Sequence, residues 1–384
     1  MDLPTTAEIV IIGGGVMGAS AAYHLAQRGL KNIVLLEKED VFGSGATGRC
    51  AGGVRYQFST EINVRLSLES LPMLERFKDE IGQQVNYQKC GYLLVATNDK
   101  DVGAFQNNVA MQNRLGVETE LLSGDEVRAR LPLMRFDDAL AGTFHQKDGL
   151  VDPNSVVAGY ISAAQRMGVR AIIGAEVIGI HVGEDQVESV ETAQGSVKTH
   201  MILNAAGPWS SLIGEMAGVQ IPVVPLRRQM FTTTPLPEIP EDFPFVIDFA
   251  QSLYFHREGS GLLIGMSNAD EIPAYDQSVD EDFELTNMEA AAARLPLLEG
   301  AGRVSHWAGL YEVTPDAHPI FGKTPVEGFY VVTGFSGHGF MHGPLSGKLM
   351  AEYILDGKFQ TLDVSMLDLA RFAEARLIRE YNVV

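Results

Sequence analysis

The sequence of 384 residues contains only two cysteines, Cys50 and Cys90. Two thiols are too few for a disulfide framework or a cysteine-based metal cluster, so we expect no metal and a reducing compartment. No apolar run approaches the roughly 20 residues that span a bilayer, and the N-terminus lacks the basic region and apolar core of a secretion signal. We therefore expect a cytoplasmic protein, or one that reaches a membrane only through partners.

Positive charge is also scarce, because 29 lysines and arginines stand against 49 acidic residues, giving a net charge of -20 at pH 7. This balance argues against nucleic acid or an anionic membrane as a ligand. The acidic excess serves solubility or complements a basic partner subunit. The apolar fraction of 46% is typical of a soluble globular enzyme, and the length is sufficient for two domains.

The most informative stretch begins with a short apolar run, Ile9 to Ile12, typical of a strand buried on both faces of a parallel sheet. Three glycines follow with the G-x-G-x-x-G spacing: Gly13, Gly15 and Gly18. Such glycines allow a tight turn, close approach of the backbone to a pyrophosphate, and close packing of a helix on the strand. The anion binds at the helix N-terminus, where the dipole favours negative charge.

An alanine-rich helix that ends at Gly29 and a second strand, Ile33 to Leu36, complete this unit. Glu37 follows about 20 residues after the glycines, where a carboxylate can accept hydrogen bonds from a ribose. The stretch therefore predicts a dinucleotide-binding unit. The alternative is a glycine-rich turn in an ordinary α/β domain.

The remainder alternates between helical and strand-like patterns. Residues 60–80 predict one long amphipathic helix, and the glycine-rich loop after residue 334 predicts a helix from about Pro344. We expect an α/β fold in which a second domain, built on an antiparallel sheet, interrupts the first. The boundaries we expect are 1–85, 145–220 and 307–384 for the dinucleotide-binding domain, and 86–144 and 221–306 for the second domain.

Four separated motifs, GGGVMGAS with LLEKE, GSGATGRCAGGVR, NAAGPWS and GFSGHGFMHGP, together resemble the D-amino-acid oxidase superfamily of FAD-dependent oxidoreductases. Within it the chain is similar to the glycine and sarcosine oxidase branch, including the β subunits of heteromeric sarcosine oxidase and of dye-linked L-proline dehydrogenase. The similarity spans nearly the whole chain. It implies FAD rather than NAD, a Rossmann-like FAD-binding domain and a discontinuous substrate domain with a large mixed or antiparallel sheet.

The resemblance places the FAD contacts in these motifs and in one strand. The implied residues are Gly13, Gly15, Val16, Met17, Gly18, Glu37, Lys38, Gly45, Ala46, Thr47, Arg49, Ala51, Gly53, Val177, Ala206, Gly207, Trp209, Gly334, Gly337, His338, Gly339, Phe340 and Met341. Backbone N–H groups of residues 337–341 are expected to stabilise the negative charge that a flavin gains on accepting a hydride. This role would also require Gly343 to be small.

The resemblance further implies that a substrate hydride passes to flavin N5 and leaves an imine. Arg55 is our candidate for holding a substrate carboxylate, with a surface or flavin-contacting arginine as the alternative. Tyr254 and His256 share one side of a strand, where pocket lining competes with ordinary packing. Tyr311 is expected beside the ring, and His342 is either a pocket base or a satisfied loop histidine.

Three positions depart from the family pattern. Met341 stands where monomeric sarcosine oxidases carry a carboxylate-binding lysine, Gly309 where they attach flavin through cysteine, and Leu263 where they carry an oxygen-activating lysine. Residues 43–55 also lack the histidine that attaches flavin in dimethylglycine-dehydrogenase-like enzymes. We therefore expect non-covalent FAD and slow reaction with oxygen.

The leading hypothesis is a dehydrogenase for a small amino acid of sarcosine, proline or glycine type, which passes electrons to a partner or dye-like acceptor. One alternative is an oxidase that uses oxygen and produces hydrogen peroxide. A second is a flavin-carrying structural or electron-relay subunit of a hetero-oligomer with an α-type partner. A soluble NAD enzyme explains the first motif but leaves GFSGHGF without a purpose.

Overall fold

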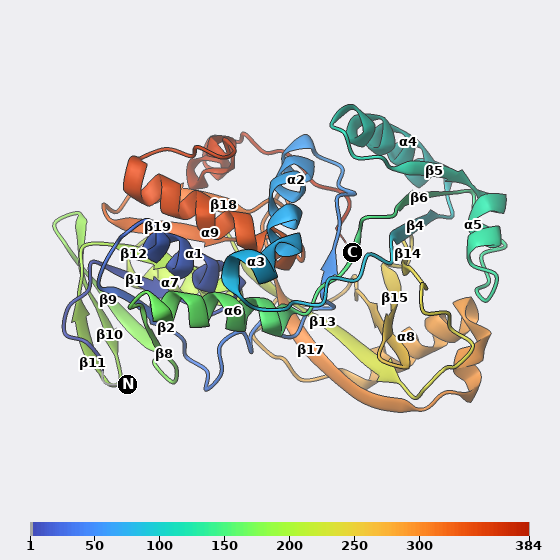
Figure 1. The fold of residues 1–384 in the computed structure, drawn as a ribbon, viewed down its shortest axis with the longest axis horizontal. Helices are drawn as coiled ribbons and strands as arrows, with labels where there is room; N and C mark the ends of the chain where they lie inside the picture. Colours follow the sequence, from blue (N-terminus) through green and yellow to red (C-terminus); the bar gives the residue numbers. More distant parts are fainter. Residues whose placement is uncertain (1–2, 384) are drawn as a thin grey trace.

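The computed structural model describes residues 3–383 and contains two large sheets that lie side by side (Figure 1). The first has six strands, in the order β18 (Ile320–Lys323), β19 (Phe329–Thr333), β12 (Ile202–Asn204), β1 (Ile9–Ile12), β2 (Ile33–Leu36) and β8 (Arg170–Ile172). Its neighbouring strands are parallel, apart from the antiparallel pair β18 and β19. This arrangement confirms the predicted Rossmann-like α/β unit.

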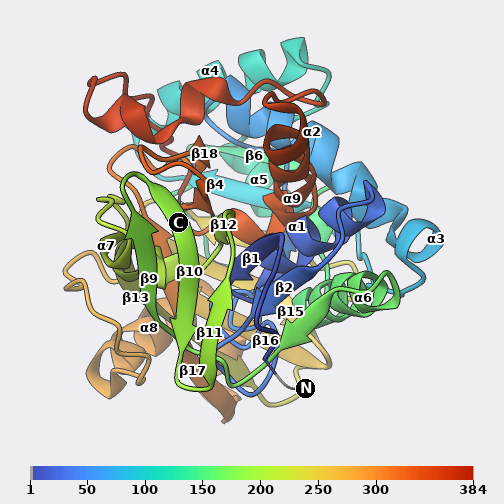
Figure 2. The same cartoon turned by 90° about the vertical axis from the view of Figure 1, so that its left-hand side faces the viewer.

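The six-stranded sheet is buried on both faces, as the unbroken apolar runs predict. Ile9 and Ile11 of β1 join a core with the helices α1 (Val16–Gln27), α2 (Glu61–Glu75), α6 (Pro153–Arg166) and α9 (Gly339–Asp356). Val10 and Ile12 join a core on the opposite face. That face is covered by α7 (Ser210–Met216) and a three-stranded sheet of β9 (Val177–Gly183), β10 (Gln186–Thr192) and β11 (Gly195–Lys198). Figure 2 shows the strands β9, β10 and β11 on that side of the sheet.

The second large sheet is mixed, and only its pair β14 and β4 is parallel. Its eight strands follow the order β17 (Arg303–Val313), β13 (Val224–Thr233), β16 (Gly261–Met266), β15 (Leu253–Glu258), β14 (Phe245–Asp248), β4 (Tyr92–Ala96), β6 (Ala141–His145) and β5 (Glu120–Ser123). One face packs on α5 (Gly124–Arg130) and α8 (Glu281–Arg294). The other contributes Tyr92, Met230 and Tyr254 to a smaller core.

The remaining elements connect these layers. They are α3 (Phe77–Ile81), α4 (Asp99–Arg114), the two-stranded sheet of β3 (Gly53–Val54) and β7 (Gly149–Leu150), and the short 3₁₀ helices η1 (Gly207–Trp209), η2 (Pro296–Gly300), η3 (Ser365–Leu367) and η4 (Leu369–Phe372). Within residues 3–383, no helix is both long and apolar enough to cross a bilayer.

Two helix predictions are wrong in detail. The expected single helix over 60–80 is interrupted at Arg76, whose ψ of 6° departs from helical geometry, and continues as α3. The expected start of the last helix near Pro344 is too late, because α9 begins at Gly339 and contains Pro344. A proline usually marks a first turn, but here the chain is already helical one turn earlier, which brings the N-terminus of α9 into the interior.

The predicted domain boundaries remain a prediction. One strand, β17, does not fit the boundary predicted between residues 306 and 307. Strand β17 crosses the expected boundary between residues 306 and 307, and pairs with β13 as far as Val313. By strand pairing alone, residues 307–313 belong with the eight-stranded sheet. These seven residues matter because Leu310 and Tyr311 reach the cavities described next.

Candidate active site

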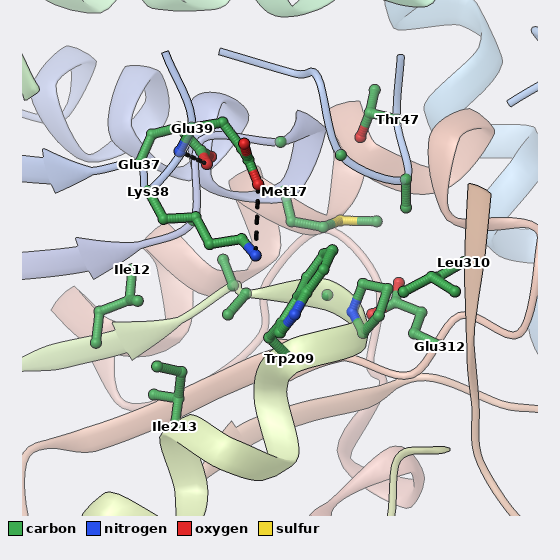
Figure 3. A pocket seen from close by; sticks show the side chains of 18 of the residues that line it. Ile12, Met17, Glu37, Lys38, Glu39, Thr47, Trp209, Ile213, Leu310 and Glu312 are labelled. Carbon is green, nitrogen blue, oxygen red and sulfur yellow. Dashed lines mark hydrogen bonds and ion pairs between the residues drawn. The ribbon is translucent and has the colours of Figure 1, made fainter. Parts of the chain in front are cut away.

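A cavity lies at the carboxyl ends of β1 and β12, and Figure 3 shows side chains that line it. These strands are neighbours in the sheet but distant in sequence, which creates the crevice where α/β sheets bind nucleotides. Val177 and Trp209 line one end of the cavity, the glycine turn after β1 lines the middle, and Tyr311 lines the other end.

The glycine turn has the geometry that its spacing predicts. Gly13 has a φ of +108°, and a Cβ atom there would lie 2.4 Å from the Ala205 carbonyl oxygen. Gly15, Val16 and Met17 line the cavity at the start of α1. A Cβ on Gly18 would lie 1.9 Å from the Gly13 carbonyl oxygen, so Gly18 keeps the helix against the turn and lies outside the cavity lining.

Glu37, which follows β2, stabilises this turn by accepting a hydrogen bond from it. One carboxylate oxygen accepts a hydrogen bond from Gly14 N–H at 2.7 Å, and the other accepts from Glu39 N–H at 2.9 Å. Beside it, Lys38 Nζ lies 3.7 Å from the centroid of the Trp209 ring and 3.4 Å from the Glu39 carboxylate (Figure 3). Glu37 and Lys38 therefore line the nucleotide end, together with Trp209.

The opposite end is formed by the glycine-rich loop and the start of α9. Gly337 has a φ of +100°, and a Cβ there would lie 2.3 Å from the Tyr311 ring. Gly337, Gly339 and Phe340 line the cavity. The N-terminus of a helix of this length favours negative charge.

Two further glycines that were predicted near the flavin make close contacts with other parts of the protein. A Cβ on Gly343 would lie 2.4 Å from Val16 Cγ2, so this residue is small because α9 packs closely on α1. Gly334 has a φ of +81° and faces the Thr314 side chain, while its N–H donates to Glu312 at 3.0 Å. Both lie outside the residues that line the two cavities.

These features fit FAD. The cavity contains a glycine cradle that side chains would fill, and the helices α1 and α9 both begin among the residues that line it. Most of the predicted contacts line it: Gly13, Gly15, Val16, Met17, Glu37, Lys38, Gly45, Ala46, Thr47, Val177, Ala206, Gly207, Trp209, Gly337, Gly339 and Phe340. Among residues 3–383, no group of three or more potential ligands is placed to hold a metal ion.

A second cavity adjoins the first beneath the eight-stranded sheet. The two share the lining residues Ala46, Cys50, Leu310, Tyr311, Gly337 and Phe340. Five residues predicted to contact FAD line this second cavity instead: Arg49, Ala51, Gly53, His338 and Met341. The wall on the sheet side comes from Tyr92, Arg228, Met230, Phe245, Ile247 and Tyr254.

Arg55, the candidate for holding a substrate carboxylate, lines the second cavity, and its guanidinium already makes two hydrogen bonds. Its two terminal nitrogens donate to the carbonyl oxygens of Gln57 and Asn382, and it lies 4.2 Å from the centroid of the Phe58 ring. The residue is buried, which lowers the pKa of its guanidinium. The remaining N–H groups are those that a substrate carboxylate can meet.

Arg228 is a second cavity arginine that the sequence reasoning missed. One terminal nitrogen donates to the Arg227 carbonyl oxygen at 2.9 Å, and the guanidinium carbon lies 5.1 Å from the centroid of the Tyr311 ring. Its buried Nε has no hydrogen-bond partner among residues 3–383. An unpaired buried donor is costly, so an anionic ligand here would satisfy it. The sequence did contain one signal for it: Arg228 and Met230 are two residues apart in a strand and therefore lie on the same face.

The other four candidates for catalysis divide into two pairs. Tyr254 and Tyr311 line the second cavity, and burial raises the pKa of both phenols. His256 lies outside the cavity, stacked on Phe245 at 5.0 Å between ring centroids, and burial lowers its pKa to about 4. Tyr254 and His256 lie on the same face of β15, as predicted, but Phe245 lies between His256 and the cavity.

His342 also lies outside both cavities. Its Nε2 lies 3.0 Å from Ser67 Oγ, and its ring packs on those of Phe58 and His338. Burial holds the pKa of His342 well below 6.5, so the ring is neutral at physiological pH. This environment matches the packed loop histidine rather than a pocket base.

Glu312 is a further residue that sequence reasoning missed. It lines the first cavity, and one carboxylate oxygen accepts hydrogen bonds from Thr333 Oγ1 at 2.7 Å and from Gly334 N–H at 3.0 Å. Burial raises its pKa. It joins β17 to the glycine-rich loop through Gly334, and the only sequence signal for it was its position next to Tyr311.

Comparison with known proteins gives a consistent picture. The family described as FAD dependent oxidoreductase matches residues 8–353. The chain is 31% identical to mitochondrial dimethylglycine dehydrogenase of Rattus norvegicus, covering 96% of this chain and 45% of that protein. It is 31% identical to FAD-dependent oxidoreductase domain-containing protein 1 of Xenopus laevis, covering 99% of this chain and 85% of that protein.

Among solved structures, L-proline dehydrogenase from P. horikoshii matches with a TM-score of 0.90 and 33% identity, covering 98% of this chain and 100% of that chain. The chain spans less than half the length of the mitochondrial dimethylglycine dehydrogenase. These similarities agree with the fold and with the cofactor that the first cavity fits.

Proposed function

The chain belongs to the family of FAD-dependent oxidoreductases, and from this premise we propose that it oxidises the C–N bond of a small amino acid of sarcosine, proline or glycine type. The observation that carries the proposal is the second cavity, which adjoins the first cavity at Tyr311 and Gly337 and is lined by two arginines. The relatives include a dimethylglycine dehydrogenase and an L-proline dehydrogenase, which supports an amino-acid substrate.

FAD, when bound, supplies the acceptor for the substrate hydride. Arg228 and Arg55 bind the carboxylate, because guanidinium groups suit carboxylates and both groups line the same cavity. Met230, Phe245 and Ile247 give the substrate side chain an apolar wall and exclude water. The α9 N-terminus favours the negative charge that the reaction develops at the flavin end.

The amine must be neutral to give up a hydride from its carbon. Two nearby guanidinium charges favour the neutral amine over the ammonium form. His338 lines the cavity, and burial keeps its pKa well below 6.5, so it adds no third positive charge. The side chains thus control the amine by electrostatics, without a dedicated base.

We further propose non-covalent FAD and an electron acceptor other than oxygen. Cys50 lines the first cavity, but burial raises the pKa of its thiol to about 11, which makes it a poor nucleophile. Met341 supplies no charge to the second cavity, and Leu263 is buried in β16 outside it. A partner subunit or a dye-like molecule would then receive the electrons.

The test is anaerobic. The purified protein is mixed singly with sarcosine, dimethylglycine, L-proline, D-proline, glycine and D-alanine, and the flavin band near about 450 nm is followed. Bleaching by one of them, with fast recovery on adding a dye and slow recovery in air, is the expected result. Fast recovery in air would favour the oxygen-using oxidase, and bound flavin that none of them reduces would favour a structural or relay subunit. Release of the flavin by acid precipitation tests the non-covalent attachment.

A further inference from the structure

Residues 380–383 follow the core of the fold and run into the second cavity. Glu380 is buried and fixes this segment at the start of α2. Its carboxylate accepts hydrogen bonds from Ser59 N–H at 2.7 Å, from Thr60 N–H at 3.1 Å and Oγ1 at 2.7 Å, and from Asn63 Nδ2 at 3.0 Å. The N-terminus of a 15-residue helix favours such an anion.

The next buried residue, Asn382, continues the attachment deeper in the molecule. Its N–H donates to Glu380 at 2.9 Å, and its side-chain oxygen accepts from Asn108 Nδ2 of α4 at 3.3 Å. Its backbone carbonyl oxygen accepts from Arg55. Arg55 is therefore held between two carbonyl groups, one of which belongs to this segment.

The residues of the segment differ in their exposure. Tyr381 is 65% exposed, whereas its neighbours Glu380 and Asn382 are each 3% exposed. Val383 lines the second cavity, together with Arg55, Tyr92 and Met341. The segment thus places one apolar residue, Val383, at the cavity and directs one carbonyl group to a cavity arginine.

We propose that residues 380–383 form a wall of the substrate cavity that orients Arg55 and limits the size of the carboxylate the cavity accepts. The inference rests on the proposed function, since it assumes that the second cavity binds an amino-acid carboxylate. Val383 is the residue that determines size, and Glu380 is a positioning residue that acts through the segment. Small amino acids fit beside Val383, and bulkier ones require a smaller residue there.

The experiment uses the FAD-loaded full chain and two unreactive carboxylates of different size, acetate and benzoate, whose binding is followed by the change in the flavin spectrum. Val383→Ala is expected to tighten benzoate relative to acetate by about fivefold or more, because it enlarges the cavity. Val383→Phe is expected to weaken benzoate by about tenfold or more. Tyr381→Ala, the matched control on the exposed side of the same segment, should leave both affinities within about twofold.

Glu380→Gln keeps the shape of the side chain and removes its charge. We expect hydrogen exchange in the peptide that contains residues 380–383 to accelerate by about tenfold or more, with weaker binding of both carboxylates. A benzoate-to-acetate ratio that none of the Val383 variants changes, or unaltered exchange in Glu380→Gln, would overturn the proposed wall. If neither carboxylate perturbs the flavin of the unmodified protein, the proposed amino-acid function fails, while hydrogen exchange still decides whether the segment is anchored by Glu380.

Discussion

The cavity beside β1 is lined in part by two glycine turns that bring backbone to its surface, whereas the sheet-side wall of the cavity beneath the eight-stranded sheet consists of long side chains. Gly13, Gly15, Gly337 and Gly339 line the first, and each lies in a turn or at a helix start. The second is lined by residues of β4, β13, β14 and β15, and by Val383. The two cavities share Tyr311 and Cys50.

This difference has a physical cause. A backbone that must approach a ligand or adopt a positive φ accepts few residues other than glycine, so its constraint is visible in the sequence. A wall of side chains needs only the right shape and charge, which many combinations supply. Substitutions should therefore act on stability and FAD content at the first cavity, and on ligand affinity at the second.

The largest expected effect comes from Gly13→Ala. The added Cβ would lie 2.4 Å from the Ala205 carbonyl oxygen at a φ of +108°. Backbone strain and overpacking each cost about 1–3 kcal/mol, so the variant should lose several kcal/mol of unfolding free energy and most of its FAD. Chemical denaturation and the ratio of flavin to protein absorbance measure both.

The control for that variant is Gly29→Ala, at the other end of the same helix. Gly29 has a φ of +94°, but a Cβ there would have no described heavy atom within 4 Å outside its chain neighbours. This variant carries the backbone strain alone, about 1–3 kcal/mol, and should retain FAD. Equal FAD loss in both variants would show that the turn acts through strain rather than through the space it leaves.

The first cavity could be predicted from the sequence because the residues that constrain it lie close together in the chain. The strand Ile9–Ile12, the turn at Gly13 and the acid Glu37 form one continuous pattern, and all three lie where it predicted. Arg228 gave no comparable signal, because its position beside Tyr311 depends on how β13 pairs with β17, more than 70 residues away along the chain. His256 was a candidate for the cavity because the alternation of residues along a strand predicts which face a side chain is on. It does not predict that another side chain, here Phe245, lies between that residue and the cavity.

Replacing Arg228 tests the second cavity directly. Arg228→Gln removes the guanidinium whose buried Nε is unpaired among the described residues. A hydrogen bond to a charged group contributes about 1.5–3 kcal/mol, so the Kd for acetate and the KM for an amino-acid substrate should rise by about 10- to 100-fold. FAD content should stay unchanged.

Arg227→Gln provides the matched comparison at the adjacent position. Arg227 lies 3.2 Å from the Glu271 carboxylate and 3.3 Å from that of Asp276, outside the cavity. We expect lower stability but an acetate Kd within about twofold of the unmodified protein. An equal loss of acetate affinity in both variants would mean that Arg228 acts through the strand rather than by contact.

His342 should affect stability rather than ligand affinity, although it lies close to both cavities. Burial lowers its folded-state pKa well below the unfolded value, so its stabilising contribution is complete above about pH 6.5 and is lost as the pH falls. Below about pH 6.5, a buried neutral histidine such as His342 lowers the free energy of unfolding by about 1.4 kcal/mol for each pH unit, until the pH reaches its folded-state pKa. His342→Gln should flatten this decline by that amount.

Denaturation between about pH 8 and about pH 5 measures the slope. A pH dependence of acetate binding that His342→Gln abolishes would instead assign His342 to the second cavity as a titrating group.

The smallest expected effect concerns a long side chain in the first cavity. Lys38 Nζ lies 3.7 Å from the Trp209 ring centroid and 3.4 Å from Glu39. A partly exposed cation over an indole contributes about 0.5–1 kcal/mol, so Lys38→Met should weaken FAD binding by no more than about fivefold. Lys31→Met is the control. Lys31 is exposed and follows α1, and its replacement should leave FAD affinity unchanged. Equilibrium titration of the FAD-free protein measures both variants. A loss as large as that of Gly13→Ala would contradict the contrast between the cavities, because a side chain would then contribute as much to FAD binding as the backbone turn.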